Sequence, residues 1–551
     1  MQSAFRNKTT LWLIVSALCF FVTSSVKSAE ATPVKNVIVV MIDGAGATHS
    51  TLARWYNNGQ PLVVEQLVTG AIRTFSAESL ITDSAPAATA FATGNKSNTK
   101  FVGVLPAKTT MPGLPQLSAD LRYKPVATIL EAAKLQGKST GLVATSNIQH
   151  ASPAGYSSHT HNRGDYNDIA EQQVYLDISV VLGGGKQYLL PKEQGGKRTD
   201  GENLINVLKT KGYQFVETRD ELAKISTGKV WGMFAKDDMA YEFDRRVLRP
   251  QEPTLAEMTR KAIHLLSQNN KGFLLFVEAS KVDWASHAND PIGVISDTLA
   301  WDDAVKEALA FAKNDGQTMV LAFADHGNGG LSIGNKSTDK NYDTLPFAAL
   351  VEPLKRATLT GEGVEKLLAG DLSESNIRFI MNNYYGIHDL AAEEVSAIQK
   401  AKKGTLNYTV GPMISQRSVL GWTTNGHTGE DLFLYAYGPA KPSGTIDNTE
   451  LATIPAKTMG LNLEAVDAKL FREANSSLSK LGATISIDKS DPANPVVRIQ
   501  KGIQRAELPV SKNILKLNGK SYPLPGLTII AAKTGKIYLP QQAIDLILAG
   551  M

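Results

Sequence analysis

Three unbroken apolar segments, each followed within two residues by an acid, dominate the hydrophobic pattern of the chain. Residues 37–42, 273–277 and 319–323 contain only Val, Ile, Leu, Met, Phe and Ala. Such runs, without alternating polar positions, are typical of strands buried on both faces of a parallel sheet. The acids that follow them are Asp43, Glu278 and Asp325. Because the carboxyl ends of parallel strands meet at one edge of a sheet, we expect these carboxylates to lie together and to bind metal ions.

The remaining pattern predicts further strands and the helices between them. Apolar runs at 140–144 and 180–182 indicate two more buried strands. Helical periodicity at 126–135, 254–267 and 295–311 indicates amphipathic helices that cover a sheet. The alternation of strand and helix predicts an α/β fold with a central, mostly parallel sheet flanked by helices.

A run of small residues from Ser84 to Gly94 predicts a short, closely packed helix. Pro86 suits its first turn, where a missing N–H costs nothing. The helix N-terminus favours an anion, so the small side chains leave room for an oxyanion above Ser84. A serine hydroxyl becomes nucleophilic only beside a base or a metal. Asp83 allows two interpretations, an ordinary N-cap or a partner of a catalytic group.

Several histidines stand where metal ligands would be expected. Asp283 and His287 are four residues apart, so one helical face carries both. His326 directly follows Asp325, and His427 lies in the glycine-rich stretch Gly-His-Thr-Gly. Arg163, close to three other histidines, could grip a phosphate with two nitrogens. Together these residues indicate a polynuclear metal site along one edge of the sheet.

Composition shifts along the chain predict four parts. Residues 1–29 are expected to be a signal peptide, and residues 30–465 a catalytic domain. Residues 354–420 are rich in helix-forming polar sequence and predict an insertion that covers the site. Residues 466–551 contain short strands, two turns and a terminal helix, which predicts a small β-rich C-terminal domain.

Charge and cysteine content indicate which partners and which cellular compartment to expect. The 551-residue chain carries 57 Lys and Arg against 53 Asp and Glu, and three of these bases lie in residues 1–29. A nearly neutral mature protein gives no reason to expect nucleic acid as a specific partner. The apolar run at 11–22 is too short to span a membrane, and its basic start predicts an export signal. It also contains Cys19, the single cysteine, so we expect an exported protein, periplasmic or secreted, without disulfides or a transmembrane segment.

Six motifs, in order, carry a resemblance to a known family. They are Asp43-Gly44, Asp83-Ser84-Ala85 with Thr93-Gly94, His150-Ala151-Ser152-Pro153 with Arg163, Glu278 through Asp283 to His287, Asp325-His326-Gly327, and Gly426-His427-Thr428-Gly429-Glu430. Over residues 34–463 the chain resembles a bacterial alkaline phosphatase. The resemblance implies a metal-dependent phosphomonoester hydrolase that acts through a phosphoserine intermediate and releases phosphate at alkaline pH.

The resemblance also implies a role for each matching residue. Ser84 would be the nucleophile, and Arg163, oriented by Asp83, would bind two phosphoryl oxygens. Two zinc ions and one magnesium ion would be the cofactors. Their expected ligands are Asp283, His287 and His427 for the first zinc, Asp43, Asp325 and His326 for the second, and Asp43, Ser152 and Glu278 for magnesium.

Two positions depart from the best-known bacterial pattern. His150 replaces an aspartate and Trp284 replaces a lysine, and both are expected beside the substrate with Arg163. The imidazole of His150 leaves the third metal open between magnesium and zinc. Trp284 removes a cation that would help to hold phosphate, so we expect weaker phosphate retention.

The sequence is also compatible with other functions. A sulfatase would need an arginine after Ser84-Ala85-Pro86, where the chain has alanines. A phosphodiesterase of the same superfamily, or an exported phosphate- or metal-binding protein without turnover, are the alternatives. The sequence leaves the oligomeric state open, with a homodimer common in the family. The C-terminal domain could bind cell-envelope material or could be a packing appendage.

Overall fold

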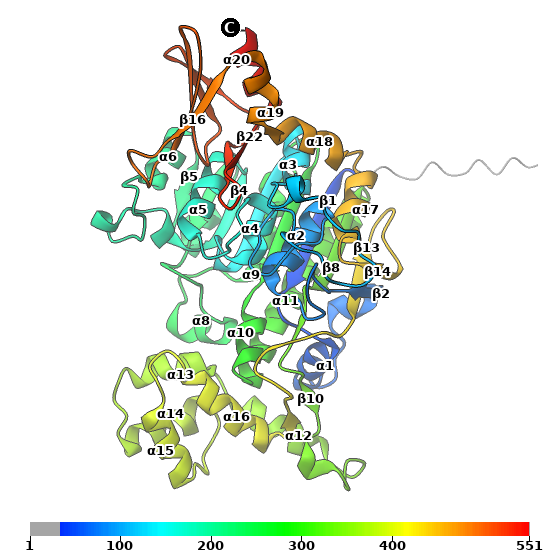
Figure 1. Cartoon of the computed structure of the whole chain (residues 1–551). Coiled ribbons are helices and arrows are strands. Elements are labelled where there is room, and N and C mark those ends of the chain that lie inside the picture. The colour runs from blue at the N-terminus through cyan, green and yellow to red at the C-terminus, as the bar shows by residue number, and fades with distance from the viewer. Residues whose placement is uncertain (1–33, 550–551) are drawn as a thin grey trace, which may run out of the picture. The chain divides into compact units, whose positions relative to one another are not determined.

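A computed structural model describes residues 34–549, which lie in one compact unit, and the predicted signal peptide at 1–29 lies outside them. Their centre is a ten-stranded sheet with the order β14-β2-β13-β8-β1-β7-β3-β4-β6-β5 (Figure 1). In that order its strands are Gly444–Asp447, Val68–Arg73, Leu432–Tyr437, Thr318–Ala324, Asn36–Ile42, Phe273–Ala279, Ser139–Asn147, Val180–Gly184, Val230–Met233 and Gln214–Val216. All neighbours are parallel except those of β13, which runs antiparallel to β2 and β8. The predicted α/β class with a mostly parallel sheet is confirmed.

The register of the three central strands brings their acidic ends together. β1 lies between β7 and β8, with Met41 opposite Glu278 and Ile42 opposite Ala324. Asp43 and Asp325, one residue beyond these pairs, therefore leave the sheet at the same edge as Glu278. This is the edge that the apolar runs predicted.

Alternate residues of β1 pack into two different hydrophobic clusters, one on each face of the sheet. Ile38, Val40 and Ile42 belong to one cluster, and Val37 and Val39 to the other. On the first face lie α1 (Ala47–Tyr56), α9 (Leu255–Leu266) and α11 (Pro291–Asp315); on the second lie α2 (Ser84–Thr93), α3 (Ile129–Leu135), α5 (Tyr166–Tyr175) and α17 (Glu450–Thr458). The remaining helices near the sheet are α4 (Ala151–Ser157), α6 (Leu204–Thr210), α7 (Arg219–Lys224), α8 (Glu242–Leu248) and α10 (Lys281–His287).

Two very short sheets fold the chain over the acidic edge. β9 (Gly327–Asn328) pairs with β12 (His427–Thr428), and β10 (Ser332–Ile333) pairs with β11 (Leu420–Gly421). The first pairing fixes His427 next to the segment that follows Asp325. Residues about a hundred positions apart thus converge on the site.

Five helices form the polar segment between β10 and β11. They are α12 (Phe347–Lys355), α13 (Gly361–Leu368), α14 (Glu374–Tyr384), α15 (Ala392–Lys400) and α16 (Asn407–Arg417). Asp290, at the start of α11, anchors them, since its two carboxylate oxygens accept hydrogen bonds from the Tyr385 hydroxyl and the Gly361 amide, each at 2.8 Å. In Figure 1 these helices gather at the opposite end of the unit from the C-terminal strands.

The C-terminal part contains two antiparallel sheets and two helices. Its elements are β15 (Arg472–Glu473), α19 (Ala474–Leu478), β16 (Thr484–Asp488), β17 (Val496–Lys501), β18 (Gln504–Pro509), β19 (Ile514–Leu517), β20 (Lys520–Pro523), β21 (Ile529–Ala531), β22 (Lys536–Leu539) and α20 (Gln541–Ala549). A further helix, α18 (Leu463–Leu470), runs across residue 465. No described helix is long and apolar enough to cross a membrane.

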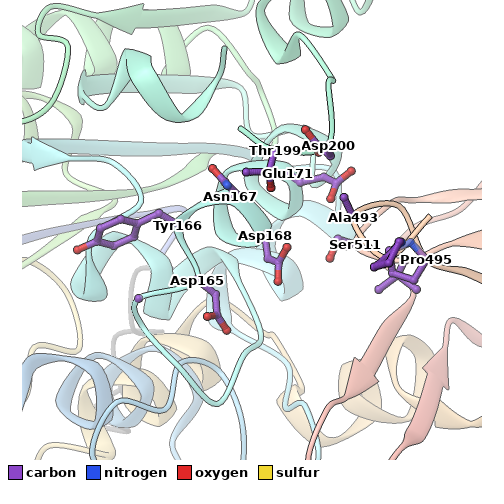
Figure 2. Close-up of a pocket in the computed structure, with 13 residues that line it drawn as sticks. Asp165, Tyr166, Asn167, Asp168, Glu171, Thr199, Asp200, Ala493, Pro495 and Ser511 are labelled. Atoms are coloured by element: carbon purple, nitrogen blue, oxygen red, sulfur yellow. The ribbon is translucent and has the colours of Figure 1, made fainter. Parts of the chain in front are cut away.

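Acidic side chains line a cavity of about 390 Å³ where α5 meets the C-terminal strands. Figure 2 shows Asp165, Asp168 and Glu171 on one side and Pro495 and Ser511 on the other. Beside it, the ammonium of Lys512 pairs with Glu171 at 3.0 Å and with Glu202 at 2.9 Å. These ion pairs attach the C-terminal strands to the sheet-bearing part of the chain.

Candidate active site

The three predicted carboxylates are buried together at the edge of the sheet. Asp43 and Glu278 are fully buried, and within residues 34–549 their four carboxylate oxygens accept no hydrogen bond. Burial and neighbouring carboxylates raise the pKa of Asp43 well above its ordinary value, and that of Glu278 to about 8. The pKa of Asp325 rises to about 7 for the same reasons. Such a cluster is costly without a compensating positive charge, which a bound cation would supply.

Three histidines complete the cluster, and their hydrogen bonds fix the orientation of each ring. The Nδ1 atoms of His287, His326 and His427 donate to the carbonyl oxygens of Asn425, Gly327 and Thr82 at 2.5, 3.2 and 2.9 Å. The Nε2 atoms then keep their lone pairs and lie within 3.2–3.6 Å of carboxylate oxygens. A backbone carbonyl at Nδ1 is the arrangement that holds a histidine as a metal ligand.

The ligand atoms fall into three groups, each close enough to hold one ion. The groups are Asp283, His287 and His427; Asp43, Asp325 and His326; and Asp43, His150 and Glu278. Asp43 belongs to two groups. Imidazole and carboxylate together suit zinc, so the donor atoms fit divalent ions of this kind.

Asp283 differs from the other carboxylates because it is held in charged form. Burial opposes the charge, but the electrostatic effect of His287, His326 and His427 lowers the pKa of Asp283 below its ordinary value. The side chain of Asn328 donates to its Oδ1 at 2.7 Å. The first ligand group is therefore ordered by residues of α10 and β9.

Ser84 is the first residue of α2 and is almost fully buried. Its hydroxyl lies 3.1 Å from Nε2 of His326, so it borders the second ligand group. Asp83 occupies the N-cap position, but its side chain makes no capping hydrogen bond. Instead, Nη1 of Arg163 donates to Asp83 Oδ1 at 2.5 Å, which removes the ordinary N-cap interpretation.

Arg163 is held from a second side by His150. Its Nη2 donates to Nε2 of His150 at 2.9 Å. Burial and the charge of Arg163 lower the pKa of His150 to about 3, so the ring is neutral and can accept this bond. The indole of Trp284 lies edge-on to His150, with ring centroids 5.8 Å apart. The guanidinium is thus held between His150 and Asp83, the residue that precedes Ser84.

All the residues singled out in the sequence converge on this edge. Ser152 is buried in α4, and no described residue forms a hydrogen bond with its hydroxyl. His150, expected beside the substrate, also lies in the third ligand group. Sequence reasoning missed Asn328, although its place two residues after His326 could have drawn attention to it.

Comparisons with known proteins agree with this geometry. The alkaline phosphatase family profile matches residues 34–461. Alkaline phosphatase 3 of Bacillus subtilis is 34% identical over 465 residues, which cover 80% of this chain and 92% of the relative. The crystal structure of Thermus thermophilus alkaline phosphatase has a TM-score of 0.69 at 26% identity and covers 78% of this chain and 93% of its own. A His-to-Asp variant of the alkaline phosphatase of the Antarctic bacterium TAB5, with Mg bound in the M3 site, has a TM-score of 0.56 at 26% identity, with 79% of this chain and 100% of that chain covered.

Proposed function

Because the chain belongs to the alkaline phosphatase family, it is a metal-dependent phosphomonoesterase, and we propose that Ser84 is its nucleophile. The observation that supports this most is the orientation of His287, His326 and His427. Their Nε2 atoms face buried carboxylates, and that of His326 also faces the Ser84 hydroxyl. A serine in such surroundings can lose its proton and attack phosphorus.

We propose that three ions occupy the three ligand groups. Zinc would be held by Asp283, His287 and His427, and a second zinc by Asp43, Asp325 and His326. Asp43, Glu278 and Ser152 would hold magnesium, or zinc if His150 joins them. Bound there, the ions supply charge that stabilises the attacking and leaving oxygens of an in-line displacement.

The chain's own residues bind and orient the substrate. Arg163 donates two N–H groups to phosphoryl oxygens, and Asp83 and His150 keep the guanidinium in place. The N-terminus of α2 adds backbone N–H groups and the positive end of a helix dipole. Phosphoryl transfer depends largely on such positioning and charge neutralisation. After transfer to Ser84 Oγ, water displaces the serine and phosphate leaves.

Trapping the phosphoenzyme tests the nucleophile assignment. Incubation with phosphate at acidic pH, followed by rapid denaturation and peptide mass spectrometry, should find the phosphoryl group on Ser84. Ser84→Ala should lose both the adduct and turnover but keep its metal content. A phosphopeptide elsewhere, or full turnover by Ser84→Ala, would exclude Ser84.

The same clamp favours monoesters over diesters, because a diester lacks one of the free oxygens. We expect faster hydrolysis of p-nitrophenyl phosphate than of bis-p-nitrophenyl phosphate. The reverse order would support the phosphodiesterase alternative. Turnover of neither, with phosphate bound, would support the binding-protein alternative.

We propose that the third group takes zinc when His150 binds the ion through Nδ1. A neutral imidazole has a single lone-pair nitrogen, so Nε2 then carries the proton and no longer accepts the hydrogen bond from Arg163. The TAB5 variant, with aspartate in place of a histidine, has Mg in its M3 site. His150→Asp should therefore raise the magnesium content of the purified protein and lower its zinc content, as measured by elemental analysis. Unchanged metal content would contradict the assignment.

We also propose export, on the strength of the basic and apolar residues in 1–29. N-terminal sequencing of the mature protein should find Glu30 as its first residue.

The C-terminal domain at 466–551 is proposed to retain the enzyme at the cell envelope. Deleting it should release the protein without loss of activity, whereas a packing role or a dimer contact would show as loss of activity or of dimer.

A further inference from the structure

Lys281 is an almost completely buried lysine at the start of α10. Its side chain is 2% exposed, whereas lysines are seldom buried unless they are paired. The ammonium lies 3.6 Å from Oε2 of Glu362 in α13. The carboxylate of Glu362 thus provides a negative partner for an ammonium that has almost no access to water.

Two aromatic rings cover this ammonium. Nζ is 4.6 Å from the ring centroid of Trp284 and 4.5 Å from that of Tyr241. Trp284 is three residues after Lys281 in α10, so both side chains project from one face of the helix. A cation over a shielded indole is attracted to it more strongly than one in water.

Trp284 connects this buried charge to the phosphate clamp. Its ring meets His150 at an angle of 83°, and His150 accepts the hydrogen bond from Arg163. A continuous series of side-chain contacts thus runs from Glu362 through Lys281, Trp284 and His150 to Arg163. Its first member belongs to the helical insertion and its last binds the substrate.

We propose that Lys281 is a positioning residue for Arg163, acting by holding the indole of Trp284 against His150. This inference rests on the proposed role of Arg163 in phosphoryl binding. Without the ammonium, the Trp284 indole loses the cation–π interaction on one face and becomes more mobile. His150 is then packed against a ring whose position is no longer fixed. The guanidinium then spends less time in the direction that binds phosphate.

Inhibition by inorganic phosphate measures this effect directly. Lys281→Met should raise the Ki of phosphate and the KM of p-nitrophenyl phosphate about fivefold, with kcat changed less. Lys281→Arg should stay within about twofold of wild type, because a guanidinium also stacks on indole. In a Trp284→Leu background, Lys281→Met should change the Ki by less than about twofold, since the two substitutions break the same connection.

A matched control comes from the other lysine that pairs with Glu362. Lys366 lies 2.6 Å from Glu362 Oε1 but is exposed and has no aromatic partner among the described residues. Lys366→Met should leave the Ki unchanged. A wild-type Ki for Lys281→Met, or an equal effect with and without Trp284, would overturn the proposal.

A second variant tests the proposal even if Lys281→Met destabilises the fold. Lys281→Met leaves Glu362 without its buried partner, so Lys281→Met with Glu362→Gln replaces both charges by neutral groups, an exchange that is often tolerated. It should show the same rise in Ki, and a wild-type Ki would count against the inference. Phosphoserine trapping at Ser84 should succeed in every variant, so a failure of the proposed nucleophile would be recognised separately.

Discussion

Gly44 shows how closely single residues are fitted around the ligand groups. Its φ is +70°, and a Cβ built on it would lie 2.5 Å from Asp283 Oδ1 and 2.6 Å from Asp283 Cα. Because the near atoms include backbone, no side-chain rotation could relieve this contact. Glycine is required there for two reasons, the backbone conformation and the lack of space.

We predict that Gly44→Ala displaces Asp283 and lowers kcat/KM by about a hundredfold, the usual effect of an ångström-scale shift in an active site. Elemental analysis should show a loss of zinc. Gly113→Ala is the matched control, because Gly113 has a φ of +81° but no atom within 4 Å of its Cβ position. Equal losses in both variants would mean that backbone strain, rather than the contact with Asp283, causes the effect.

The residues of the candidate site were largely predictable, but their orientations were not. Asp43, Glu278 and Asp325 could be found because each comes within two residues of an unbroken apolar run. The orientation of the His150 ring depends on its contact with Arg163, and the position of Arg163 is known only once the fold is known. Lys281 looks like an ordinary helix lysine until carboxylates from α8, α11 and α13 surround it.

At the scale of elements, continuous apolar runs predicted the central strands correctly, whereas the half-exposed strand β2 and the short buried strand β6 were missed. β2, at 68–73, is mostly exposed or half-buried and near the sheet edge, and its sequence shows no clear period. α11 begins at Pro291, four residues before the predicted start, because Asp290 caps it through the amide of Ile292. Periodicity finds the packed face of an element better than its ends.

A buried histidine joins α3 to the loop before α5. His159 has both ring nitrogens on acceptors, Nδ1 at 2.8 Å from the Gly103 carbonyl and Nε2 at 3.1 Å from Glu131 Oε1. Burial opposes protonation, but Glu131 and the Gly103 carbonyl raise the pKa of His159. Asp467 of α18 adds to the same shift. The doubly protonated ring satisfies both acceptors.

This pair makes stability depend on pH in a definite direction. Since the folded-state pKa is above the ordinary value of about 6.5, the stabilisation is complete below that pH and is lost as pH rises through the folded pKa. The free energy of unfolding in urea should therefore decrease toward alkaline pH by about 1.4 kcal/mol per unit of pKa shift.

His159→Gln should remove this part of the pH dependence. His161→Gln is the control, because His161 is partly exposed and burial lowers its pKa. If His159→Gln retained the wild-type slope while His161→Gln lost it, the assignment to His159 would be wrong.

At the scale of the whole molecule, Lys512 ties the C-terminal strands to α5. Its ammonium is shared by Glu171 and Glu202 and lies 5.0 Å from the Tyr175 ring centroid. Burial raises the pKa of Glu171 and Lys512 opposes this rise, while Lys512 lowers the pKa of Glu202 and so favours its charged form. Without the lysine, two carboxylates would face each other in a poorly hydrated place.

Lys512→Met should therefore lower the free energy of unfolding by about 3 kcal/mol, as when one partner of a buried pair is removed. Calorimetry would measure the change, and kcat at low temperature should stay as in wild type. Lys516→Met, on the exposed side of β19, should leave the Tm unchanged. Equal Tm values for the two variants would show that Lys512 does not anchor the C-terminal part.

Removal of metal by chelation is the most direct test of whether the side chains of the three ligand groups bind divalent cations and whether the cations activate Ser84. The enzyme is dialysed against EDTA, its metal content is measured, and hydrolysis of p-nitrophenyl phosphate is followed before and after zinc and magnesium are restored. Activity should disappear with the metal and return with it. Undiminished hydrolysis by protein shown to be free of metal would contradict this expectation.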